Sequence, residues 1–230
     1  MKQTARNTLI ALSLVAVLTL QGCAIYKEHD RRAFYLNLGD VAMGKDYYAE
    51  AFIYYKFLAN NGDAEAQYKY AKLFRDGLGI VHQNTDKAIH WYTKSADQGY
   101  LKAQIYLGNL FYSGNIKLGV KRDFDKSARW YEAAARQGSA YAQNNLGIMY
   151  CFGRGKPQNY AKAAHWFRIA ANQGRGEAQY NLGALYYRGL GVPQDMGKAQ
   201  HWFSLAAAQG RRKAGSGLVA VAQQLNLNRG

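Results

Sequence analysis

The chain has 230 residues, 49% of them hydrophobic and 14% aromatic, so it has enough apolar material for a folded core and does not read as disordered. It contains 24 glycines but only two prolines, which argues against domains joined by proline-rich linkers. Its 30 Lys and Arg residues outnumber 15 Asp and Glu, and the resulting positive field attracts any anion, from nucleic acid to lipid headgroups.

Residues 1–22 have the layout of an export signal. Lys2 and Arg6 precede an apolar run at positions 9–20, and small residues follow this run. A membrane-spanning helix would need about 20 apolar residues, and this run is too short. The N-terminus therefore predicts an exported protein.

The export signal ends in the letters LQGC, at positions 20–23. This segment resembles the lipobox of bacterial lipoproteins. The resemblance implies cleavage between Gly22 and Cys23, acylation of Cys23 and, because Ala24 is not an aspartate, sorting to the periplasmic face of the outer membrane. Two or three acyl chains would give a stable membrane anchor. The alternative is an ordinary secretory signal with an incidental cysteine.

The predicted mature chain stays strongly basic, with 28 basic residues against 15 acidic ones. Nucleic acid is not expected as its partner, because little nucleic acid is met in the periplasm. Anionic lipid or an anionic glycan remain possible ligands. Residues 23–31 form a lipid-anchored linker, which can span only about 25 Å and would keep the folded body near the membrane.

The rest of the chain is a tandem repeat. One segment occurs four times; it begins with two aromatic residues and ends with Gln-Gly. Its copies together contain all four tryptophans: WYTKSADQG (91–99), WYEAAARQG (130–138), WFRIAANQG (166–174) and WFSLAAAQG (202–210). A weaker copy, YYKFLANNG, ends at Gly62. A second phrase precedes each strong copy: AQYKYAKLFRDG (66–77), AQIYLGNLFYSG (103–114), AQNNLGIMYCFG (142–153) and AQYNLGALYYRG (178–189).

Both phrases have the apolar spacing of amphipathic helices, so each repeat is predicted to be a helix pair. Side chains able to cap the start of the second helix recur at one repeat position: Asn84, Asp123, Asn159 and Asp195. Glycines able to end that helix in the left-handed conformation recur at another: Gly99, Gly138, Gly174 and Gly210.

Glycines also occur inside the first helix of the pair, at positions 108, 147 and 183, with Ala71 in the same slot of the second unit. A glycine in a helix interior costs about 1 kcal/mol relative to alanine. We therefore expect the neighbouring helix to approach closely at these positions.

Helix pairs joined by short loops predict an all-α fold, an α–α solenoid in which each pair buries its apolar stripe against its neighbours. The repeat AQYNLGALYYRGLGVPQDMGKAQHWFSLAAAQG (178–210) resembles the Sel1-like repeat, a relative of the tetratricopeptide repeat. The resemblance covers the chain from about Arg32 to its end and implies a right-handed superhelix. We expect a degenerate first pair at 32–62, four repeats at 63–99, 100–138, 139–174 and 175–210, and a C-terminal capping helix and tail at 211–230. Ala71 and Lys156 depart from the family pattern.

The sequence offers no catalytic, metal or cofactor site. His90, His165 and His201 share one repeat position, and helix spacing of about 8–10 Å would keep them from sharing a metal ion, whose ligands each lie about 2 Å from it. Cys151 is expected to be a half-buried helix residue. The Gly-x-Gly stretches follow helices and not strands, so a phosphate-binding loop is not indicated.

The recurring Trp and Tyr side chains are expected in the core, and function is expected where repeats differ. Two variable slots lie three residues apart on the first helix, so they share one face. By resemblance to tetratricopeptide-like arrays, this helix lines the concave surface. The candidate concave interaction face comprises Lys69, Lys72, Tyr106, Asn109, Asn145, Ile148 and Asn181.

The resulting hypothesis is a non-enzymatic outer-membrane lipoprotein that binds an envelope protein and acts as a scaffold or adaptor for a periplasmic or envelope complex. The family includes lipoprotein scaffolds of exopolysaccharide export machines. Three alternatives stay open: an immunity protein that binds an effector, a binder of an anionic glycan, and a β-lactam-hydrolysing enzyme. The last is disfavoured because the relatives described in that role carry a cysteine pair in each repeat, which this chain lacks.

Overall fold

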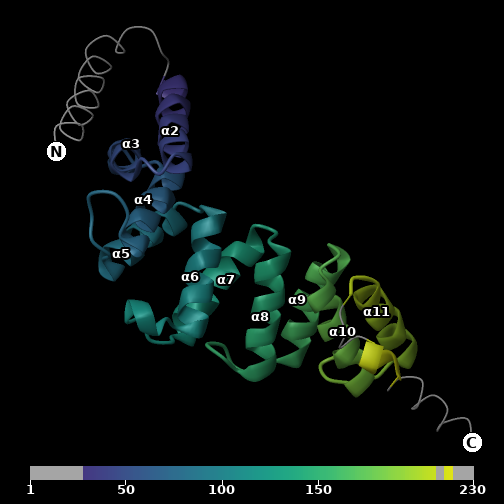
Figure 1. The fold of residues 1–230 in the computed structure, drawn as a ribbon. Coiled ribbons are helices and arrows are strands. Elements are labelled where there is room, and N and C mark those ends of the chain that lie inside the picture. The colour runs from purple at the N-terminus through teal and green to yellow at the C-terminus, as the bar shows by residue number, and fades with distance from the viewer. Residues whose placement is uncertain (1–27, 211–214, 220–230) are drawn as a thin grey trace, which may run out of the picture. The chain divides into compact units, whose positions relative to one another are not determined.

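In a computed structural model, residues 28–210 and 215–219 are described. The chain divides into two compact units, residues 1–100 and 101–230. The first unit holds two helix pairs (Figure 1): α2 (Glu28–Gly44) with α3 (Tyr48–Asn60), and α4 (Ala64–Asp76) with α5 (Thr85–Asp97). The predicted residues Gly22 and Cys23 lie outside the described part of the chain.

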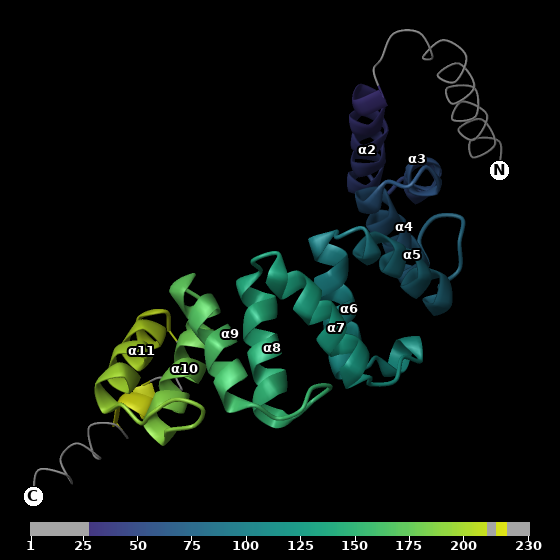
Figure 2. The same ribbon diagram turned by 180° about the vertical axis from the view of Figure 1, so that it is seen from behind.

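The second unit repeats the same arrangement in three further pairs. They are α6 (Leu101–Ser113) with α7 (Phe124–Arg136), α8 (Ala140–Phe152) with α9 (Tyr160–Asn172), and α10 (Gly176–Arg188) with α11 (Met196–Ala208). The same pairs are seen from behind in Figure 2. Each unit is thus all-α and solenoid-like, as predicted. We call α2, α4, α6, α8 and α10 the A helices and their partners the B helices.

The centre of each pair is the aromatic residue that follows the tryptophan of the B helix. Tyr92, Tyr131, Phe167 and Phe203 are at most 3% exposed. The tryptophans themselves are only half-buried, at the edge of the packing. The expectation that the indole rings form the core is therefore wrong. Successive residues of a helix are rotated by about 100°, so the ring that follows each tryptophan points into the core and the indole ring lies at its edge.

The glycines inside the A helices make room for these rings, as expected from the sequence. A Cβ built on Gly108 would lie 2.7 Å from the ring of Tyr131, and one on Gly147 would lie 2.5 Å from the ring of Phe167. The degenerate first pair follows the same rule, with a Cβ on Gly39 only 2.4 Å from the ring of Tyr55. The cost of glycine in a helix is thus offset by close helix packing.

The predicted helix boundaries are also confirmed. The side chains of all four predicted caps accept a hydrogen bond from the backbone N–H three residues on: Asn84 (2.8 Å), Asp123 (2.9 Å), Asn159 (2.8 Å) and Asp195 (2.8 Å). The glycines that follow the B helices have the left-handed backbone that ends a helix: Gly99 (φ 87°), Gly138 (91°), Gly174 (84°) and Gly210 (73°).

A glutamine pair that the sequence analysis missed ties successive helices together. Gln67 of α4 donates to the carbonyl of Ala59 in α3 (3.1 Å) and accepts from Gln98 after α5 (2.7 Å). The same amide-to-amide bond recurs in the other unit at Gln104–Gln137, Gln143–Gln173 and Gln179–Gln209. Because one member of each pair is buried, losing its partner would cost about 1–3 kcal/mol.

The loops between A and B helices differ in how they are held. A Cβ on Gly79, Gly155 or Gly191 would lie within 2.7 Å of backbone at the start of the preceding B helix, so these loops pack tightly on the previous pair. The longer loop between α6 and α7 contains a short 3₁₀ helix, η1 (Ile116–Leu118). There, apart from Gly119 itself and its two chain neighbours, no described residue lies within 4 Å of the Gly119 Cβ position, and Ile116 is 99% exposed.

At the N-terminal end, helix α2 is described from Glu28, so residues 28–31 of the predicted linker are helical. Residues 215–219 are helical, and Leu218 packs against the core of the second unit. The remainder of the predicted capping segment lies outside the described residues. Among the helices that the structure describes, none combines the length and apolar character needed to cross a bilayer.

Candidate interaction surface

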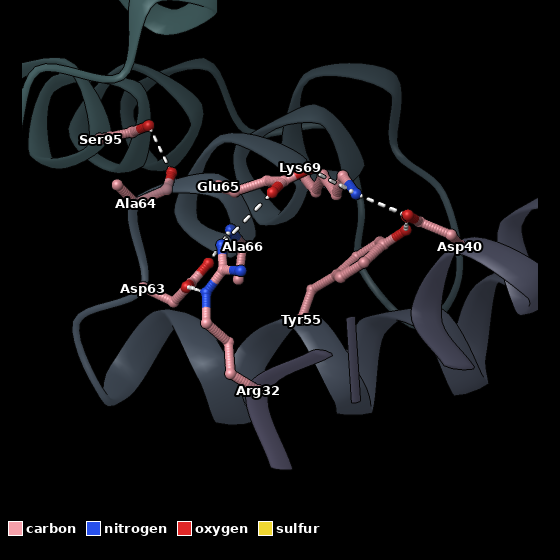
Figure 3. Close-up of polar contacts among 9 residues, drawn as sticks. All are labelled: Arg32, Asp40, Tyr55, Asp63, Ala64, Glu65, Ala66, Lys69 and Ser95. Carbon is pink, nitrogen blue, oxygen red and sulfur yellow. Dashed lines mark hydrogen bonds and ion pairs between the residues drawn. The ribbon is translucent and has the colours of Figure 1, made fainter. Parts of the chain in front are cut away.

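In the first unit, the A-helix side chains form a network of charges (Figure 3). The ammonium of Lys69 lies 2.7 Å from a carboxylate oxygen of Asp40 in α2 and 3.0 Å from one of Glu65, one turn back on α4. The hydroxyl of Tyr55 donates to the other oxygen of Asp40 (2.7 Å). Burial, together with this carboxylate, raises the pKa of Tyr55, so its hydroxyl remains a donor.

Arg32 closes the network from the start of α2. Its guanidinium pairs with Asp63 and lies 3.3 Å from Glu65, as Figure 3 shows. Asp63 also caps α4 by accepting from the N–H of Ala66 (2.7 Å). The predicted binding residue Lys69 is therefore already paired with two carboxylates. The charges on this part of the surface neutralise one another.

In the second unit, the equivalent slots carry amides and hydroxyls. The side-chain oxygen of Asn109 in α6 accepts from the hydroxyls of Tyr131 (2.6 Å) and Tyr141 (2.7 Å), which come from α7 and α8. Between α8 and α10, Asn181 donates to Asn144 (3.0 Å). Two of the predicted residues, Asn109 and Asn181, thus take part in hydrogen bonds that link one A helix to the next.

Arg175, just before α10, lies over this polar network. Its guanidinium stacks on the ring of Tyr141, 4.9 Å from the centroid, and lies 3.3 Å from Glu177. The Nε of Arg175 and the Nδ2 of Asn145 are buried and have no hydrogen-bond partner among the described residues. This part of the surface therefore contains donors that its own side chains do not satisfy.

The other predicted residues also lie on the A helices. Lys72, Tyr106 and Ile148 are half-buried, and Ile148 packs against the core of its unit. Sequence reasoning missed Tyr141, Asn144 and Arg175. One signal was available for Arg175: it occupies the capping slot held elsewhere by Asp63 and Ser139, and its side chain makes no capping bond.

Groups that could carry chemistry are dispersed. His90, His165 and His201 are exposed, each against its own neighbouring tryptophan. Burial raises the pKa of Cys151 to about 11, which keeps it a thiol at neutral pH and a poor nucleophile. Across the described part of the chain, no three His, Cys, Asp or Glu side chains are grouped to hold a metal ion.

The comparisons with known proteins agree with the repeat architecture. Five Sel1 repeats match residues 32–63, 64–100, 101–139, 140–174 and 176–210. No curated protein matches the chain.

Two solved structures are similar over most of the chain. One is a Sel1 repeat protein from Oxalobacter formigenes, 36% identical, with a TM-score of 0.64 over 76% of this chain and 50% of that one. The other is a protective antigen present in uropathogenic Escherichia coli strains, 32% identical, with a TM-score of 0.74 over 86% of this chain and 42% of that one. The chain thus spans half or less of the length of these two structures. Sel1 repeats form scaffolds suited to protein–protein interaction, and this chain belongs to the Sel1 repeat family.

Proposed function

We propose that the protein is a lipid-anchored, non-enzymatic adaptor at the periplasmic face of the bacterial outer membrane, where its A-helix surface binds another envelope protein. The main observation behind this proposal is that, within each repeat, the positions that pack the helices differ from the positions that vary on the surface. A buried ring and a small residue opposite it recur in every described pair, and the glutamine pair recurs in four of them, whereas the A-helix slots change. Variation on a constant framework is how repeat scaffolds distinguish partners.

The second unit offers the better contact region. Tyr106 and Ile148 are half-buried apolar surfaces, and Arg175 and Asn145 nearby hold donors without acceptors. A partner segment that supplies backbone carbonyls or a carboxylate would satisfy them after small side-chain rotations. Burying such donors against a partner without acceptors would cost about 1–3 kcal/mol each, which favours polar, extended segments over purely apolar ones.

The anchor is supported by the sequence alone. The LQGC segment at positions 20–23 and the apolar run before it have the layout of a lipoprotein signal. A Cys23→Ala variant should leave the outer-membrane fraction, and mass spectrometry of the native N-terminus should find acyl chains on Cys23. A variant that still fractionates with the outer membrane would contradict the acyl anchor.

The binding surface is tested by photocrosslinking in intact cells. A benzoylphenylalanine placed at Tyr106 or Ile148 should crosslink a recurrent protein partner, identified by mass spectrometry. The same group at the exposed B-helix positions Arg129 and His165 serves as the matched control. Crosslinks that arise only from the controls, or only to lipid, would defeat the adaptor proposal.

A further inference from the structure

The first helix pair has an exposed aromatic face. Phe34 and Val41 of α2 are each 46% exposed, and Phe57 of α3 is 48% exposed. Helix α2 is the first that the structure describes, and within the described residues no earlier pair packs on it (Figures 1 and 2). Large apolar side chains grouped in this way mark an interaction surface.

The rings on this face are in contact with one another. Tyr35 lies 5.7 Å from Phe34 and 5.0 Å from Phe57, measured between ring centroids. An open hollow of about 640 Å³ lies beside these rings, and its lining includes Arg31, Tyr35 and Phe57 together with the ion pair of Arg32 and Asp63. Phe34, Tyr35 and Phe57 thus form one aromatic cluster with charged groups at its edge.

The pattern along α2 places a positive charge at both ends of the apolar stripe. At about 100° per residue, the side chains on one arc of about 80° are Arg31, Phe34, Leu38, Val41 and Lys45. This stripe contains no acidic residue. Asp40 lies about 100° away on the other side of the helix, where Lys69 and Tyr55 hold its carboxylate.

The place of this face in the chain indicates what covers it. Four residues separate Cys23 from Glu28, and five Cα steps span at most about 18 Å. An acyl anchor at Cys23 would therefore hold α2 within one short tether of the lipid headgroups. Aromatic residues flanked by Arg and Lys are the composition of protein surfaces that rest at a lipid interface.

We propose that this outer face, made of Arg31, Phe34, Tyr35, Val41, Lys45 and Phe57, lies on the anionic phospholipid surface of the membrane that holds the anchor. This inference rests on the lipid anchor of the proposed function. The aromatic rings enter the headgroup region, and Arg31 and Lys45 contact lipid phosphates, each contributing in proportion to the negative charge of the leaflet. The contact fixes how the first unit faces the membrane and leaves the Lys69–Asp40 ion pair on a different side of α2.

The test measures the depth of single side chains in the membrane. The acylated chain, in a Cys151→Ser background, carries one nitroxide label in place of Phe34, Val41 or Phe57 and is reconstituted into phosphatidylethanolamine–phosphatidylglycerol vesicles. Collision of the label with oxygen, relative to a water-soluble nickel chelate, should be several-fold higher at each of these positions than at the exposed control positions Ile116 and Phe152. Equal ratios at all five positions would overturn the proposal. Spin–spin broadening at position 41 would also overturn it and identify a second copy as the occupant.

A charge variant tests the lipid class. Replacing both Arg31 and Lys45 with Gln should lower the oxygen ratio at position 41 in vesicles that contain phosphatidylglycerol. The matched control, Lys117→Gln with Lys121→Gln, removes two exposed charges from the α6–α7 loop and should leave the ratio unchanged. No difference between the pairs would overturn the assignment to anionic lipid. Failure of the anchor is distinguished separately, by the absence of acyl chains on Cys23 in mass spectrometry.

Discussion

The A helices of the two units carry different chemistry on the same framework. In the first unit, Lys69 and Arg32 hold a set of carboxylates in ion pairs. In the second, Asn109 and Asn144 join neighbouring helices through amide and hydroxyl hydrogen bonds. The comparison teaches that in this repeat the surface slots can change from ionic to neutral while the packing beneath them stays the same.

The largest expected effect tests whether the packing beneath is shared. Tyr55→Ala in the first unit and Phe167→Ala in the second each remove a ring at most 2% exposed, so each should lower the free energy of unfolding by about 3–5 kcal/mol. Urea denaturation followed by circular dichroism measures both. Trp166→Ala, which removes a half-buried ring, should cost less than Phe167→Ala. Equal losses of stability in Trp166→Ala and Phe167→Ala would show that the tryptophan belongs to the core as much as the phenylalanine does.

The glycine slot gives the next largest effect. In Gly147→Ala the new methyl group would lie 2.5 Å from the ring of Phe167, so overpacking should cost about 1–3 kcal/mol despite the better helix propensity of alanine. The first unit already has Ala71 in this slot, and Ala71→Gly should cost only about 1 kcal/mol. Thermal unfolding of the two variants would show the asymmetry. A more stable Gly147→Ala protein would contradict the close packing.

The two surface networks should respond differently to salt. Asn109→Leu leaves the hydroxyls of Tyr131 and Tyr141 without their acceptor, which should cost about 1–2 kcal/mol at any ionic strength. Lys69→Met breaks partly exposed ion pairs and should cost about 1 kcal/mol or less, with the loss shrinking in high salt. Urea titrations at roughly 0.05 M and 1 M NaCl, where charges are weakly and strongly screened, distinguish the two losses of stability. A salt-dependent loss in Asn109→Leu would remove the contrast.

The smallest effect concerns acid. Hydrogen bonds from the backbone of Lys126 and Lys198 lower the pKa of the capping carboxylates Asp123 and Asp195. A lowered folded-state pKa contributes stability above the unfolded pKa, near 3.9, and this stability is lost as pH falls through the folded pKa. The double variant Asp123→Asn with Asp195→Asn should therefore show a flatter decline in stability below about pH 4. Helix α5 of the first unit, which is capped by the uncharged Asn84, is the natural control. If the stability of the double variant falls with acid as steeply as that of the unmodified protein, these caps do not cause the decline.

Much of the framework could be predicted from the sequence because its requirements are local. A capping side chain, a left-handed glycine and a glycine opposite a ring each act within one helix pair, so Asn159, Gly174 and Gly147 could be assigned by position. Helical periodicity located the apolar stripe, which contains both Trp166 and Phe167, but did not distinguish the half-buried indole from the fully buried ring next to it.

The surface could be predicted less well, because its contacts join different repeats. That Asn109 meets Tyr141 depends on how two pairs stack, and that Lys69 meets Asp40 depends on the degenerate first pair. The departure at Lys156 is explained in the same way: its ammonium lies 2.6 Å from Glu132 in the preceding B helix, and this bond lowers the pKa of Glu132. Contacts between side chains that differ from repeat to repeat leave no periodic signal in the sequence.

The loops between A and B helices also determine where the protein tolerates added sequence. Gly79, Gly155 and Gly191 lie directly against neighbouring backbone, so lengthening those loops would push adjacent pairs apart. In the loop between α6 and α7, Ile116 is 99% exposed, and among the described residues only the chain neighbours of Gly119 lie within 4 Å of its Cβ position. An epitope tag or fluorescent domain inserted there should leave the fold intact, which makes residues 115–119 the preferred site for an internal label that spares both the predicted acylation site at Cys23 and the proposed binding surface of the A helices.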